Sequence, residues 1–387
     1  MSSAVSSAAR LIMRRCDELG RISEERGALT RTFASPAMKR ANKLVGSWMR
    51  QAGMTVREDA AFNLIGRRPA AKRNAKAVII GSHLDTVRNA GKYDGPLGVL
   101  LGIAVAQRLH GHDLPFHLEV VGFSDEEGVK YHTTYLGSRA MLGLLTKHDL
   151  KTIREKGIAK ARRQRGGLLA YLEAHIEQGP VLQARRRALG VVTAIAGQTR
   201  IRACFTGRAG HAGTTPMRMR KDALCAASEV VLAAEKLGVV ATVGQCAVDP
   251  GVSNVIPGRV TFSLDVRDAK DARRQGACAK LYRVASAVAR RRGLRLDWKV
   301  VQETPTAPME ARLSAILRRS AGQAPLLPSG AGHDAAEMAL ACPAAMLFIR
   351  CKDGISHHPD ESVRTADVGA ALDALTRSVL EMAARYA

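Results

Sequence analysis

The sequence has little of what would assign it to several special classes of protein. Aromatic residues make up only 4% of its 387 residues. No apolar run reaches the roughly 18 residues that a membrane-spanning helix needs. The N-terminal stretch up to Arg21 has no continuous apolar core of the kind found in secretory signal peptides. We therefore expect a chain that is neither inserted into a membrane nor exported.

Cysteine is present, but without a pattern. The seven cysteines are scattered and odd in number, and no two of them form a Cys-x-x-Cys pair. Such spacing argues against a disulfide framework and against a structural zinc site built from cysteine. A reducing compartment fits this usage, and we expect the protein to be cytoplasmic.

Acidic residues are few relative to basic ones, with 35 Asp and Glu against 59 Lys and Arg, which gives a net charge of +24. A balance of this kind occurs in proteins that bind nucleic acid, an acidic membrane surface or an anionic substrate. Here the basic residues lie in separate clumps, and no aromatic stacking motif is interleaved with them. The pattern favours a solvated basic surface and argues against a nucleic-acid partner.

Strand and helix patterns alternate over most of the chain, which predicts a mostly parallel α/β sheet. Short apolar strands are expected within 76–83, 117–128 and 344–358, with a helix over 95–110 between the first two. Before them, Ser35 and Pro36 have the residue types of an N-cap and a first helical turn.

The middle of the chain has a different pattern. Val260, Phe262, Leu264 and Val266 alternate with polar residues, which is typical of a half-exposed antiparallel strand. Helices near 221–236 and 268–292 could cover the apolar side of such a sheet. The sequence therefore predicts a small α+β domain over 199–307, inserted into a larger α/β domain formed by 1–198 and 308–387.

Four polar clusters each follow an apolar strand: "SHLDT", "SDEEG", "EAHIEQGP" and "GISHHPDE". Ligands bind beyond the carboxyl ends of the strands in open α/β sheets, so neighbouring strands would bring these clusters together. Imidazoles and carboxylates in such a cluster are common ligands of hydrolytic metal sites, and five ligands with one bridging carboxylate can hold two metals. The candidate residues are His83, Asp85, Asp94, Glu126, Glu127, His175 and His357.

Two of these clusters contain adjacent groups that suit different tasks. In "DEEG", one glutamate can coordinate a metal while its neighbour stays available as a general base. In "SHLDT", His83 and Asp85 share one face of a strand, so the carboxylate can orient the imidazole. Alternation in "YLEAHIEQ" places His175 on the polar face of a half-buried strand. Any one of these histidines, taken alone, is more often a core or surface residue.

Several motifs, taken together, resemble the hydantoinase/carbamoylase family of metal-dependent amidohydrolases, which is related to the di-zinc aminoacylases and carboxypeptidases. The motifs are "GSHLDTV…AGKYDG", "FSDEEGVKY", "HIEQGP", "GRAGHAGTTPM", "SNVIPG…DVR", "SGAGHDA" and "GISHHPDE". The resemblance implies a catalytic domain of the di-zinc exopeptidase type with an inserted lid and dimerisation domain. It also implies two divalent metal ions, Mn²⁺ or Zn²⁺, in each subunit of a homodimer.

The resemblance further implies roles for individual residues. The metal ligands would be His83, Asp94, Glu127, His175 and His357, with Asp94 bridging the two ions. Glu126 would be the general base, and Asp85 would orient His83. His211 would stabilise the oxyanion from across the dimer, and the resemblance leaves open whether Asn254 is donated with it. Asn254 and Arg267 would hold the substrate carboxylate, and Gln178 and His333 would make further substrate contacts.

Each of these substrate residues also has a plainer structural explanation. Arg267 could pair with Asp265, and His211 could be an exposed loop residue. Asn254 and Gln178 could serve turns, and His333 could neighbour a helix cap. A planar guanidinium on the polar face of a strand nevertheless suits bidentate binding of a carboxylate.

Members of this family hydrolyse a ureido or carbamoyl C–N bond near a carboxylate. The stretches "RTFASPAMKRANKLVGSWMRQAGM", "AGKYDGPLG" and "IRCKDGISH" resemble allantoate amidohydrolases most, so allantoate is the expected substrate. An N-carbamoyl-L-amino acid or ureidoglycolate is the alternative within the family. Outside enzymes, the basic charge allows a nucleic-acid-binding protein on a hydrolase scaffold, although the complete set of candidate ligands argues against it.

Overall fold

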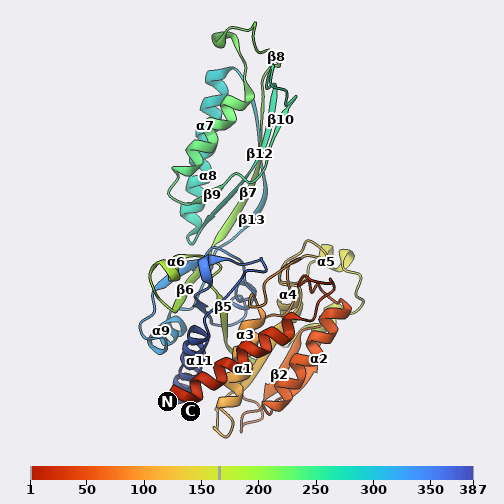
Figure 1. The fold of residues 1–387 in the computed structure, drawn as a ribbon, viewed down its shortest axis with the longest axis vertical. Helices are drawn as coiled ribbons and strands as arrows, with labels where there is room; N and C mark the ends of the chain where they lie inside the picture. Colours follow the sequence, from red (N-terminus) through yellow and green to blue (C-terminus); the bar gives the residue numbers. More distant parts are fainter. Residues whose placement is uncertain (1, 164–166, 387) are drawn as a thin grey trace. The chain divides into compact units, whose positions relative to one another are not determined.

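The computed structural model describes residues 2–163 and 167–386, and the chain divides into two compact units (Figure 1). The larger unit comprises residues 1–193 and 308–387, and the smaller unit comprises residues 194–307. The smaller unit begins five residues before the expected position of 199, because strand β7 (Gly197–Thr206) already belongs to its sheet. The lid and dimerisation roles of this unit stay predictions.

A nine-stranded sheet forms the centre of the larger unit, as far as the described residues show. Its path runs β1-β2-β4-β3-β5-β16-β6-β14, and β15 pairs with β6. The four middle strands β4, β3, β5 and β16 are parallel to one another, and β2 and β6 flank them in antiparallel orientation. The strands are β1 (Thr55–Glu58), β2 (Leu64–Arg68), β3 (Ala77–His83), β4 (His117–Phe123), β5 (Leu168–Ile176), β6 (Leu189–Ile195), β14 (Ala307–Pro308), β15 (Leu326–Ser329) and β16 (Ala344–Ile349).

Helices of the larger unit pack on this sheet and on one another. Helix α3 contacts β3, β4 and β5, while α9 and α11 contact β16, and α1 lies against α3 and α11. Helix α10 contacts β5 and β16, and it also packs on α4. The helices are α1 (Ser2–Gly20), α2 (Pro36–Gln51), α3 (Pro96–Arg108), α4 (Leu136–Leu142), α5 (Lys147–Thr152), α6 (Val181–Ala184), α9 (Ala311–Ser320), α10 (Asp334–Met338) and α11 (Thr365–Tyr386), with 3-10 turns η1 (Ile158–Ala161) and η4 (Lys352–Gly354).

Local signals in the sequence explain where several elements begin. Helix α2 starts at Pro36, and the hydroxyl of Ser35 accepts a hydrogen bond from the main-chain N–H of Met38 at 3.0 Å. An N-cap of this kind satisfies one of the unpaired donors at a helix start and contributes about 1 kcal/mol. The predicted N-cap is confirmed.

Strand β5 differs from the prediction. The alternation in its sequence suggested one polar, solvated face, but both faces are covered, and Glu173 and His175 are buried like their apolar neighbours. The reason is its place in the sheet, between the parallel strands β3 and β16. The polar side chains of this strand therefore need buried partners, not water.

The smaller unit consists of an antiparallel sheet with two helices on one face (Figure 1). Its main sheet has the order β10-β12-β7-β13, with β9 beside β12, and a separate pair is formed by β8 and β11. Apolar residues of β7 and β12 face the helices in one core, as their alternation predicted. The elements are β7 (Gly197–Thr206), β8 (Gly210–His211), η3 (Met217–Met219), α7 (Ala223–Glu235), β9 (Val240–Thr242), β10 (Cys246–Asp249), β11 (Val255–Ile256), β12 (Arg259–Asp268), α8 (Asp271–Arg292) and β13 (Arg295–Thr304).

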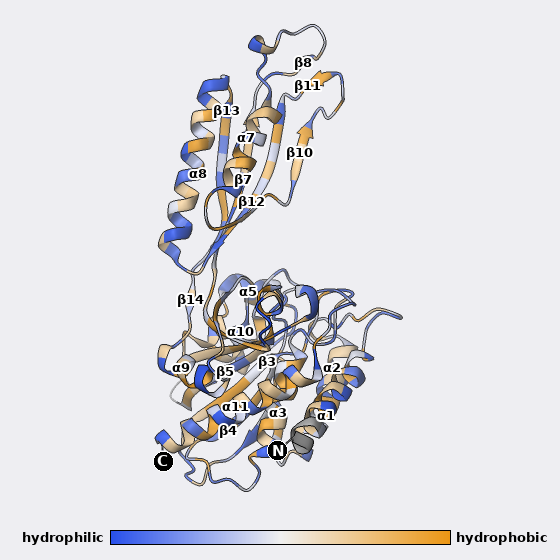
Figure 2. Cartoon of the chain, turned by 60° about the vertical axis from the view of Figure 1, so that its left-hand side comes forward, coloured by the Kyte–Doolittle hydropathy of each residue, from blue (hydrophilic) through white to orange (hydrophobic). Residues whose placement is uncertain are grey.

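The exposed surface of α8 carries part of the basic charge. Figure 2 shows both ends of this helix in the colour of hydrophilic residues, where Arg273 and Arg290–Arg292 lie. In the part of the chain that the structure describes, no helix is both long enough and apolar enough to cross a membrane.

Candidate metal centre and active site

The four polar clusters that follow apolar strands lie at one edge of the large sheet. Strands β4, β3, β5 and β16 are neighbours in that order and run parallel. The register pairs His83 with Phe123 at the ends of β3 and β4, and it pairs His175 with Phe348 near the ends of β5 and β16. Because the carboxyl ends of parallel strands meet at one edge, the clusters converge there, as predicted.

Asp94 lies at the centre of this cluster, and its two carboxylate oxygens face different imidazoles. Its Oδ1 is 3.3 Å from Nε2 of His83 and 3.1 Å from Nε2 of His175. Its Oδ2 is 3.4 Å from Nε2 of His357, which lies 3.4 Å from Oε1 of Glu127. Three groups of candidate ligand atoms lie together among the described residues. One is His83–Glu126–Glu127, and the other two are the sets His83–Asp94–His175 and Asp94–Glu127–His357. Asp94 belongs to both of these sets, which is the arrangement that a bridging carboxylate requires.

The two buried histidines present their Nε2 atoms to the same point. Nδ1 of His83 is 3.0 Å from the carbonyl oxygen of Asp85, and Nδ1 of His175 is 2.9 Å from that of Ile176. A carbonyl oxygen can only accept, so each Nδ1 carries the hydrogen and each neutral ring keeps its lone pair on Nε2. The two Nε2 atoms are 3.4 Å apart and both face Asp94. Such a donor set fits a metal cation.

The electrostatics of the cluster support the same assignment. Burial raises the pKa of Glu127 to about 8, and burial is also the main cause that raises the pKa of Glu126 well above its ordinary value. Burial alone would lower the pKa of His83, but the neighbouring carboxylates, Asp94 first among them, outweigh it and raise that pKa. The raised pKa values of the two glutamates and of His83 indicate a surplus of buried negative charge, which a divalent cation would compensate.

The carboxylate of Asp85 does not orient the ring of His83 as predicted, because it binds the main chain of Glu126 and Glu127 instead. Its Oδ1 accepts a hydrogen bond from the main-chain N–H of Glu126 at 3.1 Å, and its Oδ2 accepts one from Glu127 at 3.2 Å. The carboxylate is 3.7 Å from Nδ1 of His83, which is too long for a hydrogen bond. The main-chain carbonyl of Asp85 contacts His83 instead, so the side chain fixes the Glu126–Glu127 turn.

Two predicted substrate residues lie inside the cluster of the larger unit. Nε2 of Gln178 donates to Oδ2 of Asp94 at 2.8 Å, and its Oε1 is buried without a partner among the described residues. His333 is 1% exposed and packs edge-on against the ring of His175, with ring centroids 4.5 Å apart. Its Nε2 lies 2.9 Å from the hydroxyl of Ser329. His333 therefore supports His175 in this structure.

The smaller unit brings His211 and Asn254 together. Strands β8 and β11 pair His211 with Val255, and the main-chain N–H of Ala212 donates to the carbonyl oxygen of Asn254 at 3.0 Å. The main-chain N–H of Gly213 donates to Nδ1 of His211 at 3.0 Å. Because Nδ1 accepts that hydrogen bond, a neutral His211 carries its hydrogen on Nε2, where it can act as a donor.

Arg267 makes the ion pair that was the plainer of its two explanations. Its guanidinium binds both carboxylate oxygens of Asp265, at 2.9 and 3.0 Å. Gln198 and Arg200 also contact this carboxylate, at 2.5 and 3.5 Å. The ion pair fixes the direction of the guanidinium on the outer face of β12.

Several polar residues that support the site could not be recognised from the sequence. Glu361 and Ser356 lie in the quoted "GISHHPDE" and contact the Asp94 loop. Glu173 accepts hydrogen bonds from Ser82 at 3.1 Å and from Tyr171 at 2.9 Å, directly behind the ligand-bearing strand ends. For Glu173 the sequence offers one signal, a carboxylate in an otherwise apolar strand, and this signal does not specify the partner of Glu173.

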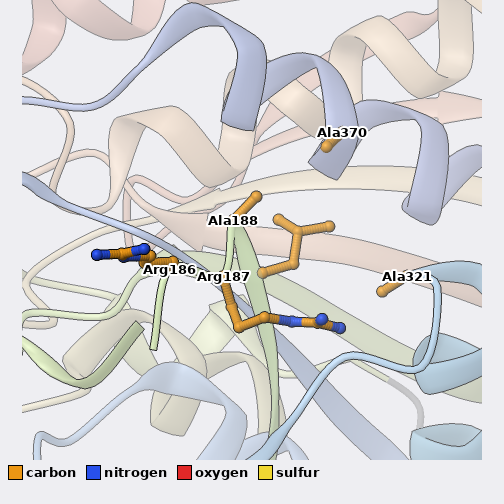
Figure 3. Close-up of a pocket in the computed structure, with 6 residues that line it drawn as sticks. Arg186, Arg187, Ala188, Ala321 and Ala370 are labelled. Carbon is orange, nitrogen blue, oxygen red and sulfur yellow. The ribbon is translucent and has the colours of Figure 1, made fainter. Parts of the chain in front are cut away.

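A pocket elsewhere in the larger unit has a different chemical character (Figure 3). Its lining residues are Arg186, Arg187, Ala188, Leu189, Ala321 and Ala370. None of these six side chains is a carboxylate, an imidazole or a thiol. The pocket therefore lacks the groups that general-base or metal-assisted hydrolysis requires.

Known proteins resemble the chain over most of its length. The model of peptidase family M20/M25/M40 matches residues 79–381. A probable allantoate deiminase of Oryza sativa subsp. japonica is 39% identical, over 92% of this chain and 85% of that protein. An N-carbamoyl-L-amino acid amidohydrolase of Geobacillus stearothermophilus is also 39% identical, over 96% of this chain and 98% of that protein.

Solved structures support the same family assignment. The crystal structure of an amidase of the hydantoinase/carbamoylase family from Burkholderia multivorans has a TM-score of 0.90 and 32% identity, and it covers 97% of this chain and 98% of that one. The family resemblance and the α/β fold predicted from the motifs are confirmed. The chain belongs to peptidase family M20/M25/M40 and, among its amidohydrolase relatives, is a hydrolase that acts on carbon–nitrogen bonds.

Proposed function

We propose that the protein hydrolyses allantoate to ureidoglycine, ammonia and carbon dioxide. The observation that carries the hydrolytic part is the convergence of two ligand sets on the two oxygens of Asp94. The choice of allantoate rests on the quoted motifs and on relatives named allantoate deiminase in Oryza sativa and Glycine max. Location in the cytoplasm is part of the same proposal.

Two divalent ions, Mn²⁺ or Zn²⁺, complete the proposed site. His83, His175 and one oxygen of Asp94 would hold the first ion, and Glu127, His357 and the other oxygen would hold the second. When bound, such ions polarise the ureido carbonyl and lower the pKa of water toward neutrality.

Glu126 acts as general base in this proposal. Its main-chain N–H is tied to Asp85, so its position beside the ligand Glu127 is fixed by the same carboxylate. The Glu126 carboxylate takes a proton from the attacking water and then delivers it to the leaving nitrogen. Asp85 is thereby a positioning residue for both glutamates.

Arg267 would bind the substrate carboxylate, with its guanidinium fixed by Asp265. His211 and Asn254 lie far from Arg267 in the same chain. Arg267 and Arg259 are separated by about 26 Å along β12, at roughly 3.3 Å per residue. The β8–β11 pair lies next to the Arg259 end of that strand, because β11 ends three residues before Arg259 and β8 begins four residues after its register partner Thr206 (Figure 2). A single substrate that meets Arg267 and His211 therefore takes the two residues from different chains.

This separation supports a homodimer in which His211 and Asn254 are supplied by the second subunit. Nε2–H of His211 would donate to the oxyanion that forms on the ureido carbonyl, and the Asn254 amide would contact the carboxylate. The smaller unit, residues 194–307, would then serve as lid and dimerisation domain.

The alternative substrate with the strongest support is an N-carbamoyl-L-amino acid. The Geobacillus relative named for that activity is as similar to this chain as the Oryza relative. Ureidoglycolate presents the same ureido group and carboxylate, so the same residues would bind it. The site does not support a nucleic-acid-binding function, because its candidate metal ligands are of the kind that hydrolytic enzymes use.

The proposal is tested by measuring ammonia release from a panel of substrates. Metal-loaded protein is incubated with allantoate, with several N-carbamoyl-L-amino acids and with ureidoglycolate. We expect kcat/KM for allantoate to exceed the others by at least roughly tenfold, because binding energy is matched to one substrate. A preference for an N-carbamoyl amino acid would assign the alternative, and no turnover with metals bound would exclude both.

A further inference from the structure

We propose that Glu361 is a positioning residue that aims the two oxygens of Asp94 at the two metal sites, an inference that rests on the proposed metal centre. Glu361 is 4% exposed and belongs to the loop that carries His357. Its Oε1 accepts hydrogen bonds from the main-chain N–H groups of Tyr93 at 2.7 Å and of Asp94 at 3.0 Å. One side chain thus fixes the main chain of the bridging residue.

The other half of the Glu361 carboxylate reaches the side chain of Asp94 through Ser356. Oε2 of Glu361 is 3.2 Å from the hydroxyl of Ser356. That hydroxyl makes a short hydrogen bond to Oδ2 of Asp94, the oxygen that faces His357. Main chain and side chain of Asp94 are therefore both held from the His357 loop. This ring of three residues, together with Nε2 of Gln178, which also donates to Oδ2, fixes the rotation of the carboxylate and so decides which oxygen faces which ligand set.

Gly91 shows that the loop is shaped around Glu361. A Cβ atom at Gly91 would lie 2.4 Å from Cβ and Cδ of Glu361 and 2.5 Å from its Oε1. Real Cβ atoms do not approach other atoms so closely, so any side chain at this position displaces Glu361 or the loop. The close approach of Glu361 accounts for Gly91, the first glycine of "NAGKYDG".

The hydrogen count of the ring predicts which substitution is tolerated. A serine hydroxyl has one hydrogen, and here it goes to Asp94 at the shorter distance. An amide at position 361 keeps an oxygen for the two main-chain N–H groups and offers its NH₂ group to the Ser356 oxygen. Glu361→Gln therefore preserves the ring, whereas Glu361→Ala removes all of its contacts.

The test measures metal affinity, which needs no substrate and is therefore independent of the allantoate proposal. Metal-free protein is titrated with Mn²⁺ and with Zn²⁺ against a chelator, for Glu361→Ala, Glu361→Gln, Ser356→Ala and Gly91→Ala. We expect Glu361→Ala and Gly91→Ala to weaken binding by about 10–100-fold, as loss of groups that orient metal ligands does. Glu361→Gln should bind like the unaltered chain, and excess metal should restore kcat in Glu361→Ala without a change in KM.

Asp360→Ala is the matched control, because that neighbouring side chain is 77% exposed and should leave metal affinity unchanged. Unaltered affinity in Glu361→Ala would overturn the inference, as would a loss in Glu361→Gln as large as in Glu361→Ala. Should Glu361→Ala fail to fold, the comparison of Glu361→Gln with Ser356→Ala decides. The inference requires the serine variant to bind metal more weakly than the glutamine variant, and the reverse order contradicts it.

Discussion

Replacing Glu126 by glutamine is expected to lower kcat by about 10²–10⁴-fold for every substrate that the protein hydrolyses. The amide has the shape of the carboxylate but cannot take a proton from water or deliver it to the leaving nitrogen. Asp85 holds the main-chain N–H of residue 126, a contact that the substitution leaves in place. The two ligand sets that share Asp94 do not contain Glu126, and the glutamine amide keeps an oxygen beside His83 and Glu127, so both metal ions should stay bound.

Glu127→Gln is the matched control for this experiment. It makes the same chemical change at the adjacent residue, which belongs to a ligand set with Asp94 and His357. We expect this variant to lose metal as well as activity, and metal analysis alongside the kinetics separates the two effects. A Glu126→Gln variant that turns over at the unaltered rate would remove Glu126 from the role of general base.

Mixing two inactive variants is expected to restore activity if active sites are shared between subunits. Glu126→Gln disables the site on its own chain, whereas His211→Ala disables the site on the partner chain. A mixed dimer then contains one site with both defects and one intact site. Random exchange produces about half mixed dimers, so about a quarter of the unaltered activity should return.

The control mixes Glu126→Gln with Asp94→Ala, since both changes belong to the same half of each site. No mixed dimer of that pair contains an intact site, so no activity should return. The measurement is ammonia release after subunit exchange, with dimer formation checked by sedimentation. No recovery in the first mixture, with exchange demonstrated, would contradict donation of His211 across an interface.

Most of the fold could be predicted from local sequence patterns. Ser35 and Pro36 marked the start of α2, and the alternation in β12 marked a half-exposed strand, because each depends on neighbours close in sequence. The burial of both faces of β5 could not be predicted in this way. It depends on which strands lie beside β5, and those strands come from distant parts of the chain.

The ligand sets could be listed from the sequence for a related reason. Residues after apolar strands converge in any parallel sheet, so His83 and His175 could be placed at one edge. The contacts that support these ligands could not be predicted, because they join segments that no sequence pattern links. Glu361 contacts Asp94 from 267 residues away, and the Asp85 carboxylate contacts the Glu126–Glu127 main chain from across the sheet edge.

The central claim is that the two oxygens of Asp94 divide the cluster into two metal sites. Counting bound Mn²⁺ or Zn²⁺ by mass spectrometry after dialysis tests it most directly, on the unaltered chain, His357→Ala and Asp94→Ala. We predict about two ions per unaltered chain, about one in His357→Ala, and almost none in Asp94→Ala. A single ion in the unaltered chain, or two ions retained without Asp94, would contradict the claim.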